Sequence, residues 1–308
     1  MDYTEKLSQI IKASGLSQQV LAGKLGVSLV SLNNWLNGKA TPTRQDFQAQ
    51  IDLLYAQYLG VSEIDQARLT SLKEQALTYR LTAKNLLKNR RILDKITLNL
   101  TYHTNTIEGS TMTKADVKAV IFDDKTLKNR TQTEQREAIN HRVALEFLLN
   151  ELAAGTLSYT PDMIRKVHLL LMNGILSNAG EWRNHGVRIQ GSRVPLANFI
   201  KIPALMQNLC NKFAEETADP ISVLARTHAD FEQIHPFSDG NGRTGRLLLF
   251  IKSLELQIMP PIIPQDRKLV YYKYLELAQM ERRYDNFEQF IAETIIATGE
   301  EMEERPTK

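Results

Sequence analysis

Apolar residues recur at intervals of three and four along most of this chain, which is the spacing of one helix face. The segment 145–152 shows the pattern clearly, and 163–175 repeats it. Strand-like alternation is confined to 186–194, which is short enough for one β-hairpin. We therefore expect a mainly α fold, made of a large helical domain with one β-hairpin and a small all-α domain.

Charge and composition suggest four successive segments in the 308 residues. We expect a small helical domain at 1–62, a basic helical connector at 63–95, a large helical domain at 96–298 and an acidic tail at 299–308. Basic side chains outnumber acidic ones in the connector, which indicates either the solvated face of a linking helix or a flank that contacts phosphates.

Several classes of protein are disfavoured by the composition. The single cysteine, Cys210, excludes a disulfide framework and a cysteine-rich zinc site. Apolar runs are too short for a membrane span, and the first residues lack the apolar stretch of a signal peptide. We expect a cytoplasmic protein without a membrane partner.

The amino-terminal segment carries signals for two short helices joined by a tight turn. Ser17 and Ser28 are suited to cap the two helices, and Gly26 supplies a permissive backbone between them. Leu21, Leu25, Leu32 and Trp35 form an apolar seam. Residues 5–60 resemble the helix-turn-helix of the Cro and phage-repressor family.

That resemblance implies DNA binding, with the second helix in the major groove. The side chains placed for DNA contact are Gln18, Ser28, Leu29, Val30, Asn34 and Lys39. Leu29 and Val30 could meet only thymine methyl groups among the base edges. The alternative is a helical bundle used for dimerisation or for docking a partner.

The segment 235–246 reads His-Pro-Phe-Ser-Asp-Gly-Asn-Gly-Arg-Thr-Gly-Arg. Pro236 ends the preceding helix, and the glycines that follow allow backbone N–H groups to converge at the start of the next one. Arg243 and Arg246, three residues apart, extend this anion site. Asp239 is a hard ligand suited to Mg²⁺, and His235 has the chemistry of a general base.

This combination resembles the signature of the Fic family of nucleotidyl transferases, His-x-Phe-x-Asp/Glu-Gly-Asn-Gly-Arg-x-x-Arg, which is matched at every fixed position. The resemblance covers about 95–298. It implies transfer of AMP from ATP to a Ser, Thr or Tyr hydroxyl of a protein, with His235 as the base and Asp239 holding Mg²⁺ on the phosphates. It also implies α-phosphate binding by Gly240, Asn241 and Gly242, β-phosphate binding by Arg243 and γ-phosphate binding by Arg246.

Two further segments receive roles from the same resemblance. The hairpin at 186–194 resembles the family's flap, so Val187, Arg188 and Ile189 are expected to hold the target segment. Tyr271, Tyr272 and Gln279 resemble the adenine-pocket segment, with ordinary helix packing as the alternative. Trp182 and Arg183 precede the hairpin and are expected to anchor it, Trp182 in the core and Arg183 on a carboxylate.

A second motif precedes the large domain. Residues 104–109 read Thr-Asn-Thr-Ile-Glu-Gly and match the family's inhibitory motif, Ser/Thr-x-x-x-Glu-Gly/Asn. By resemblance, Glu108 pairs with Arg246 and withholds it from the γ-phosphate. Glu108 alternatively orients a water that removes AMP from a modified target.

Three functions remain open from the sequence. The first is an autoinhibited protein adenylyltransferase that binds DNA, and the second is a DNA-binding transcriptional regulator whose nucleotide site only senses ATP. The third is a deAMPylase or an enzyme that transfers another phosphate-linked group. The expected partners are ATP, a protein target with a hydroxyl side chain, DNA and a second copy of the chain in a homodimer.

Overall fold

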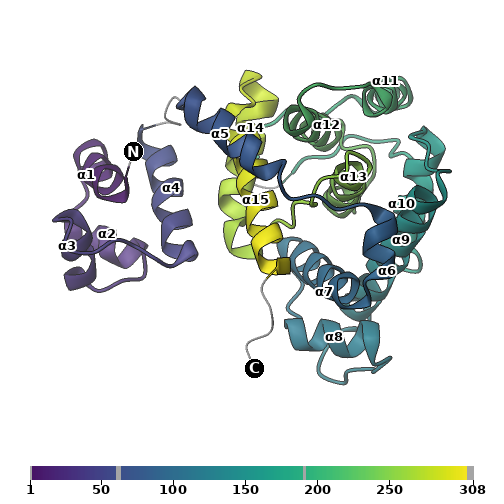
Figure 1. Ribbon diagram of the computed structural model, residues 1–308, viewed down its shortest axis with the longest axis horizontal. Helices are drawn as coiled ribbons and strands as arrows, with labels where there is room; N and C mark the ends of the chain where they lie inside the picture. The colour runs from purple at the N-terminus through teal and green to yellow at the C-terminus, as the bar shows by residue number, and fades with distance from the viewer. Residues whose placement is uncertain (1, 60–63, 190–191, 304–308) are drawn as a thin grey trace. The chain divides into compact units, whose positions relative to one another are not determined.

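The computed structural model describes residues 2–59, 64–189 and 192–303, and it confirms a mainly helical chain (Figure 1). The chain divides into two compact units. One contains Met1–Asp65 and Asp266–Tyr274, and the other contains Gln66–Gln265 and Leu275–Lys308. The described residues include no helix long and apolar enough to cross a lipid bilayer.

The first unit is built from four helices at its amino-terminal end, α1 (Tyr3–Ser14), α2 (Gln18–Lys24), α3 (Leu29–Leu36) and α4 (Gln45–Leu59). The expected caps are present, because Ser17 and Ser28 each accept a bond from a backbone N–H in the first turn of α2 and α3. Gly26 has φ +63°, the left-handed conformation that the turn requires. Leu21, Leu32 and other apolar side chains form a separate core.

The second unit holds the 3₁₀ turn Phe199–Lys201 and the helices α5 (Gln66–Ala76), α6 (Ala83–Lys88), α7 (Arg90–Ile107), α8 (Lys114–Phe122), α9 (Gln132–Ala154), α10 (Pro161–Met172), α11 (Ile202–Ala214), α12 (Pro220–Ile234), α13 (Asn241–Glu255) and α15 (Asp285–Glu303). A second 3₁₀ turn, Gln265–Arg267, begins at the last residue of the segment Gln66–Gln265 and continues into the first unit. Helix α14 (Lys268–Glu281) follows the second turn. Helices α5 and α6 fall in the segment expected to be a connector, and they pack on α15 and α9.

Helix α13 is the central element of this unit. It packs against α7, α9, α10 and α12, and its residues are buried on every side. A helix that is buried all round has no solvent face, so its apolar run 247–251 lies inside the core. Helix α13 is thereby held by four neighbouring helices, and its amino-terminal end carries Asn241, Arg243 and Arg246 of the segment 235–246.

The segment 186–194 differs from the hairpin expected of it. Its described residues, 186–189 and 192–194, carry no strand, and Gln190 and Gly191 lie outside the described part of the chain. Val187, Arg188 and Ile189 therefore stand in irregular backbone. A two-stranded hairpin without a third strand or a packed face is marginally stable, which accounts for the difference.

Candidate functional site

The loop between α12 and α13 begins with His235. Helix α12 ends here, since His235 adopts φ 50° and ψ 61° and donates its backbone N–H to Phe231 O. The imidazole Nδ1 lies 3.3 Å from Glu232 O, and because a carbonyl only accepts, Nδ1 carries the proton. Burial lowers the pKa of His235 to about 4, with a smaller contribution from Arg183. The His235 imidazole is therefore neutral, and its Nε2 is available to accept a proton.

Arg183 fixes the backbone of this loop. Its Nε donates to His235 O at 2.7 Å, while its Nη1 and Nη2 donate to His185 O at 2.8 Å and Ala197 O at 2.6 Å. Arg183 was expected to pair with a carboxylate, and in the structure it bonds backbone carbonyl groups instead. Irregular segments leave buried carbonyls without helix or strand partners, and one guanidinium can satisfy several of them. Trp182, as expected, packs against an apolar cluster of the core.

Asn241 closes the loop on itself. Its Oδ1 accepts from the backbone N–H of Phe237 and its Nδ2 donates to Phe237 O, both at 2.9 Å. The side chain is 2% exposed. Both of its polar atoms are therefore engaged in shaping the loop, which leaves the backbone N–H groups at the start of α13 as the anion-binding donors.

His168 of α10 supports the loop, a role that was not predicted from the sequence. Its ring stacks on Phe237 with centroids 3.6 Å apart. Gly180 donates its N–H to Nδ1 at 2.8 Å, so Nε2 carries the proton and donates to Asp239 O at 2.9 Å. The only signal in the sequence was a histidine in an apolar helical pattern, which is more often a core residue.

Asp239 and Arg243 form the polar mouth of the site. Asp239 Oδ1 accepts from Gly240 N at 2.6 Å, and Oδ2 lies 3.6 Å from Arg243 Nη2. Arg243 is also held by Glu137 of α9 at 2.7 Å, a partner that the sequence did not reveal. Gly240, at φ 78°, leaves no room for a Cβ because Met172 Sδ would lie 2.8 Å away.

The Asp239 side chain is 64% exposed, so this carboxylate is accessible at the mouth. Among the described residues no group of three His, Cys, Asp or Glu side chains could hold a metal. One accessible carboxylate fits Mg²⁺, which is typically held by one or two carboxylates, substrate phosphates and water rather than by a protein cage.

Arg246 lies one turn further along α13, and the structure brings Glu108 to it. Arg246 Nη2 donates to Glu108 Oε1 at 2.5 Å, and its Nε donates to Thr104 Oγ1 at 2.5 Å. Glu108 caps the carboxyl end of α7, and its Oε1 would lie 2.3 Å from a Cβ on Gly242. The glycine of the motif thus lets the glutamate rest directly on the first turn of α13.

Titratable groups of two helices, α9 and α12, lie around this ion pair. His141 of α9 and His228 of α12 are buried, and desolvation with the charge of Arg246 lowers the pKa of each to about 3. Burial raises the pKa of Glu232 to about 8, an effect that Glu108 increases and Arg246 opposes. Both histidines are therefore neutral, and Glu232 is largely protonated at neutral pH.

The residues predicted to form the adenine pocket, Tyr271, Tyr272 and Gln279, belong to α14. Tyr271 and Tyr272 have ring centroids 5.0 Å apart and fall in the unit formed by residues 1–65 and 266–274. Gln279 is buried and donates to Ala229 O at 3.1 Å, so its amide nitrogen makes a structural bond. Contacts of these residues with a base remain a prediction.

Of the predicted DNA-contact residues, Gln18 begins α2, Ser28 caps α3, and Lys39 follows the end of α3, while Leu29, Val30 and Asn34 lie on α3. Leu29 is 41% exposed and Val30 is 70% exposed. Gln18 and Lys39 are exposed as well, while Asn34 is half-buried.

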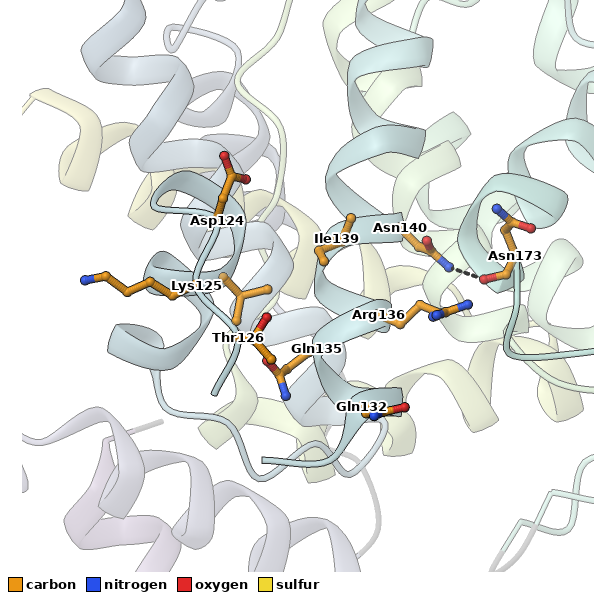
Figure 2. Close-up of a pocket in the computed structure, with 10 residues that line it drawn as sticks. Asp124, Lys125, Thr126, Gln132, Gln135, Arg136, Ile139, Asn140 and Asn173 are labelled. Atoms are coloured by element: carbon orange, nitrogen blue, oxygen red, sulfur yellow. Dashed lines mark hydrogen bonds between the residues drawn. The ribbon is translucent and has the colours of Figure 1, made fainter. Parts of the chain in front are cut away.

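A polar pocket of about 610 Å³ lies apart from the residues of the motif, between α9, the loop after α8 and Asn173 (Figure 2). Asn140 donates to Asn173 O at 2.9 Å, and Gln135 donates to Leu127 O at 3.0 Å. The two side-chain amides bond the backbone of neighbouring loops, so their role in the pocket wall is structural. None of the predicted site residues lines it.

Comparison with known proteins matches two families. Residues 158–251 match the Fic/DOC family, and residues 7–64 match a helix-turn-helix family. The protein adenylyltransferase Fic of Drosophila virilis is 30% identical over 239 residues, which span 76% of this chain and 48% of that protein. The chain thus spans about half the length of the curated relatives it matches.

Solved structures show the same fold. A fragment of Fic-1 from C. elegans superposes with a TM-score of 0.70 at 23% identity, covering 95% of this chain and 90% of that one. A Fic family protein from Desulfovibrio desulfuricans G20 gives a TM-score of 0.63 at 25% identity, covering 78% of this chain and 75% of that one. The chain therefore contains a Fic/DOC-family domain preceded by a helix-turn-helix domain.

Proposed function

We propose that this chain is an autoinhibited protein adenylyltransferase whose helix-turn-helix domain binds DNA. The observation that carries the proposal is the convergence of a neutral histidine, an exposed carboxylate and the amino terminus of α13 with two arginines, one of which is paired with Glu108. The curated relatives named protein adenylyltransferase Fic support the reaction.

The reaction uses His235 as the general base. The hydroxyl oxygen of a Ser, Thr or Tyr side chain attacks the α-phosphorus of ATP as His235 Nε2 takes the hydroxyl proton. A bond forms between that oxygen and phosphorus, and the bond from phosphorus to the β-phosphate oxygen breaks, so pyrophosphate leaves with the electron pair. The N–H group of Gly242 and the guanidinium of Arg243 bind the phosphates.

Mg²⁺, held by Asp239 and the phosphates, would supply charge neutralisation at the phosphate oxygens. Phosphoryl chemistry of this kind depends mainly on positioning and charge, which the fixed loop provides. The loop is fixed because Arg183, Asn241 and His168 each bond its backbone.

Glu108 is the proposed brake. Arg246 is 3% exposed and is engaged by both Glu108 and Thr104, so it lacks the freedom to bind a γ-phosphate while α7 stays in place. A charge-assisted pair in this buried setting competes directly with a phosphate for the same guanidinium.

The proposal is tested by ATP-dependent self-labelling of purified protein with radiolabelled ATP. Glu108→Gly should raise labelling strongly, and adding His235→Ala should lower it again by about 10²-fold or more, the range for loss of a general base. A matched control is Glu151→Gly, near the end of α9, which should label as weakly as the unchanged protein. Equal labelling of Glu108→Gly and the unchanged protein would rule the brake out.

DNA binding is supported by the helix-turn-helix match and by the exposure of the first turn of α3. A mobility-shift assay with the promoter region of the protein's own gene should show a complex at low salt. Lys39→Ala should weaken this complex and reduce its salt dependence by about one counter-ion. Lys12→Ala, a basic change on α1 outside the predicted contact set, serves as the control. No complex at low salt would remove DNA from the proposal.

A further inference from the structure

A buried glutamate lies between the base and the brake, and the reaction described above does not use it. Glu232 is 5% exposed and stands one turn before His235 on α12. Its Oε2 lies 4.0 Å from His235 Nδ1. Its other oxygen, Oε1, has no hydrogen-bond partner among the described residues, which is an unusual state for a buried carboxyl group.

The absence of a side chain at Gly245 creates the space for this carboxyl group. A Cβ on Gly245 would lie 2.3 Å from Glu232 Oε1 and 2.9 Å from the ring of Phe231. Helix α13 therefore accommodates the carboxyl group at its crossing with α12. The next residue of α13 after Gly245 is Arg246, the arginine that pairs with Glu108.

The charged groups around Glu232 come from two other helices. Arg246 of α13 favours the ionised carboxylate, and Glu108 at the end of α7 disfavours it. On α12 itself, His228 is neutral because burial lowers its pKa. On α15, the ring of Phe287 stacks on His228 with the two ring centroids 6.0 Å apart.

We propose that Glu232 is a positioning residue for the transfer, and that its carboxylate stabilises the imidazolium ion that His235 becomes when it takes the proton from the target hydroxyl. The inference rests on the proposed function. The carboxylate faces Nδ1, the nitrogen that already carries a proton, so it leaves Nε2 free for the reaction. It acts through His235 and touches neither ATP nor the target.

The need for such a group follows from the burial of the base. Burial lowers the pKa of His235 to about 4, which makes the ring a poor acceptor of a proton at neutral pH. A negative charge 4.0 Å from Nδ1 opposes this effect. Burial keeps Glu232 largely protonated, and the negative charge of Glu108 adds to this effect. Departure of Glu108 therefore favours the carboxylate form of Glu232, so that the brake acts on the base as well as on Arg246.

The test compares Glu108→Gly with Glu108→Gly/Glu232→Gln, because glutamine keeps the shape of the side chain and removes its charge. In ring-labelled protein, NMR titration of His235, assigned by its loss in His235→Ala, should show a lower pKa in the double variant. Self-labelling should show a fall in kcat of about tenfold to a hundredfold with an unchanged KM for ATP.

Two further variants separate positioning from a structural role. Glu288→Gln neutralises an equally buried glutamate that bonds Lys73 instead, and it should leave the pKa of His235 unchanged. Glu232→Asp, with its shorter side chain, should restore part of kcat. An unchanged pKa of His235 in the glutamine variant overturns the proposal, and so does a raised KM for ATP with an unchanged kcat.

Failure of the proposed function itself looks different. In that case Glu108→Gly alone is inactive, whereas the NMR titration still reports whether Glu232 affects His235, since it needs no turnover.

Discussion

Two buried asparagines, Asn241 and Asn105, show how differently the two halves of the site are built. Asn241 bonds the backbone of Phe237 with both polar atoms of its side chain. Asn105, on α7 beside Thr104, is 3% exposed, and neither of its side-chain polar atoms has a hydrogen-bond partner among the described residues. One amide stabilises the structure around it, and the other carries an uncompensated desolvation cost.

The two asparagines indicate which part of the site is permanent. The catalytic loop is fixed by bonds from α10, α13 and the segment before the proposed flap. By contrast, α7 buries polar side-chain atoms that have no hydrogen-bond partner within residues 2–59, 64–189 and 192–303. His141 adds to this contrast, because its Nε2 also has no partner among the described residues. For Glu108 to act as a brake, it must be able to move away from Arg246. The buried polar atoms without partners make the packing of α7 less stable than apolar side chains would, which favours this movement.

The largest loss of stability at neutral pH is expected from a substitution of Asn241. Asn241→Leu should lower the free energy of unfolding by roughly 2–4 kcal/mol, since it leaves the buried N–H and C=O of Phe237 without partners. Urea denaturation followed by circular dichroism measures the change. In the Glu108→Gly background the same substitution should abolish self-labelling. A loss of less than about 1 kcal/mol would mean that the loop does not depend on this amide.

A smaller effect is expected at Thr104. Thr104→Val keeps the shape of the side chain and removes the acceptor for Arg246 Nε, which should cost about 1.5–3 kcal/mol because the donor is charged. The brake should loosen as well, so self-labelling should rise above that of the unchanged protein. Thr156→Val, at an exposed loop position, is the control. Unchanged stability and unchanged labelling together would contradict the prediction.

Acidification should weaken the region around α7 through His141. The folded-state pKa of about 3 lies below the ordinary value of 6.5, so the unfolded chain binds the proton first. Stability is therefore fully present above pH 6.5 and is lost as the pH falls towards 3, by up to about 1.4 kcal/mol per pH unit. His141→Gln should flatten this dependence in urea titrations at a series of pH values, while His228 stays in both proteins. Parallel curves for the two proteins would contradict it.

The smallest effect, with the opposite sign, is expected at Asn105. Asn105→Leu should raise the free energy of unfolding by about 1 kcal/mol, because it removes buried polar atoms that have no partners. The tighter interface should also lower the residual self-labelling of the otherwise unchanged protein. If this substitution destabilises the fold as Asn241→Leu does, the contrast between the two asparagines disappears.

Local features of the structure could be predicted from the sequence, and longer-range pairings could not. The caps at Ser17 and Ser28, the left-handed Gly26 and the helical character depend on neighbours within a few residues. The meeting of Glu108 with Arg246 was expected only because a family resemblance supplied it.

Other interactions of the site join residues far apart in the sequence, and they depend on how the helices cross. Glu137 meets Arg243 from 106 residues away, and His168 meets Asp239 from 71 residues away. Arg183 illustrates the same limit, because its type predicted a carboxylate and the irregular backbone around it offered carbonyls instead. No local pattern encodes which carbonyls of a loop will lack partners once the helices have packed.

The left-handed backbone of His235 has a consequence for how this family of sites can change. A residue with a Cβ at φ 50° ends α12 at a cost of about 1 kcal/mol relative to glycine, which is the usual residue at a helix end of this kind. The base is thus aimed by a conformation that the chain would adopt more easily without it. Replacement of His235 by glycine would therefore stabilise the end of α12 and preserve the fold, but it would remove the catalytic base.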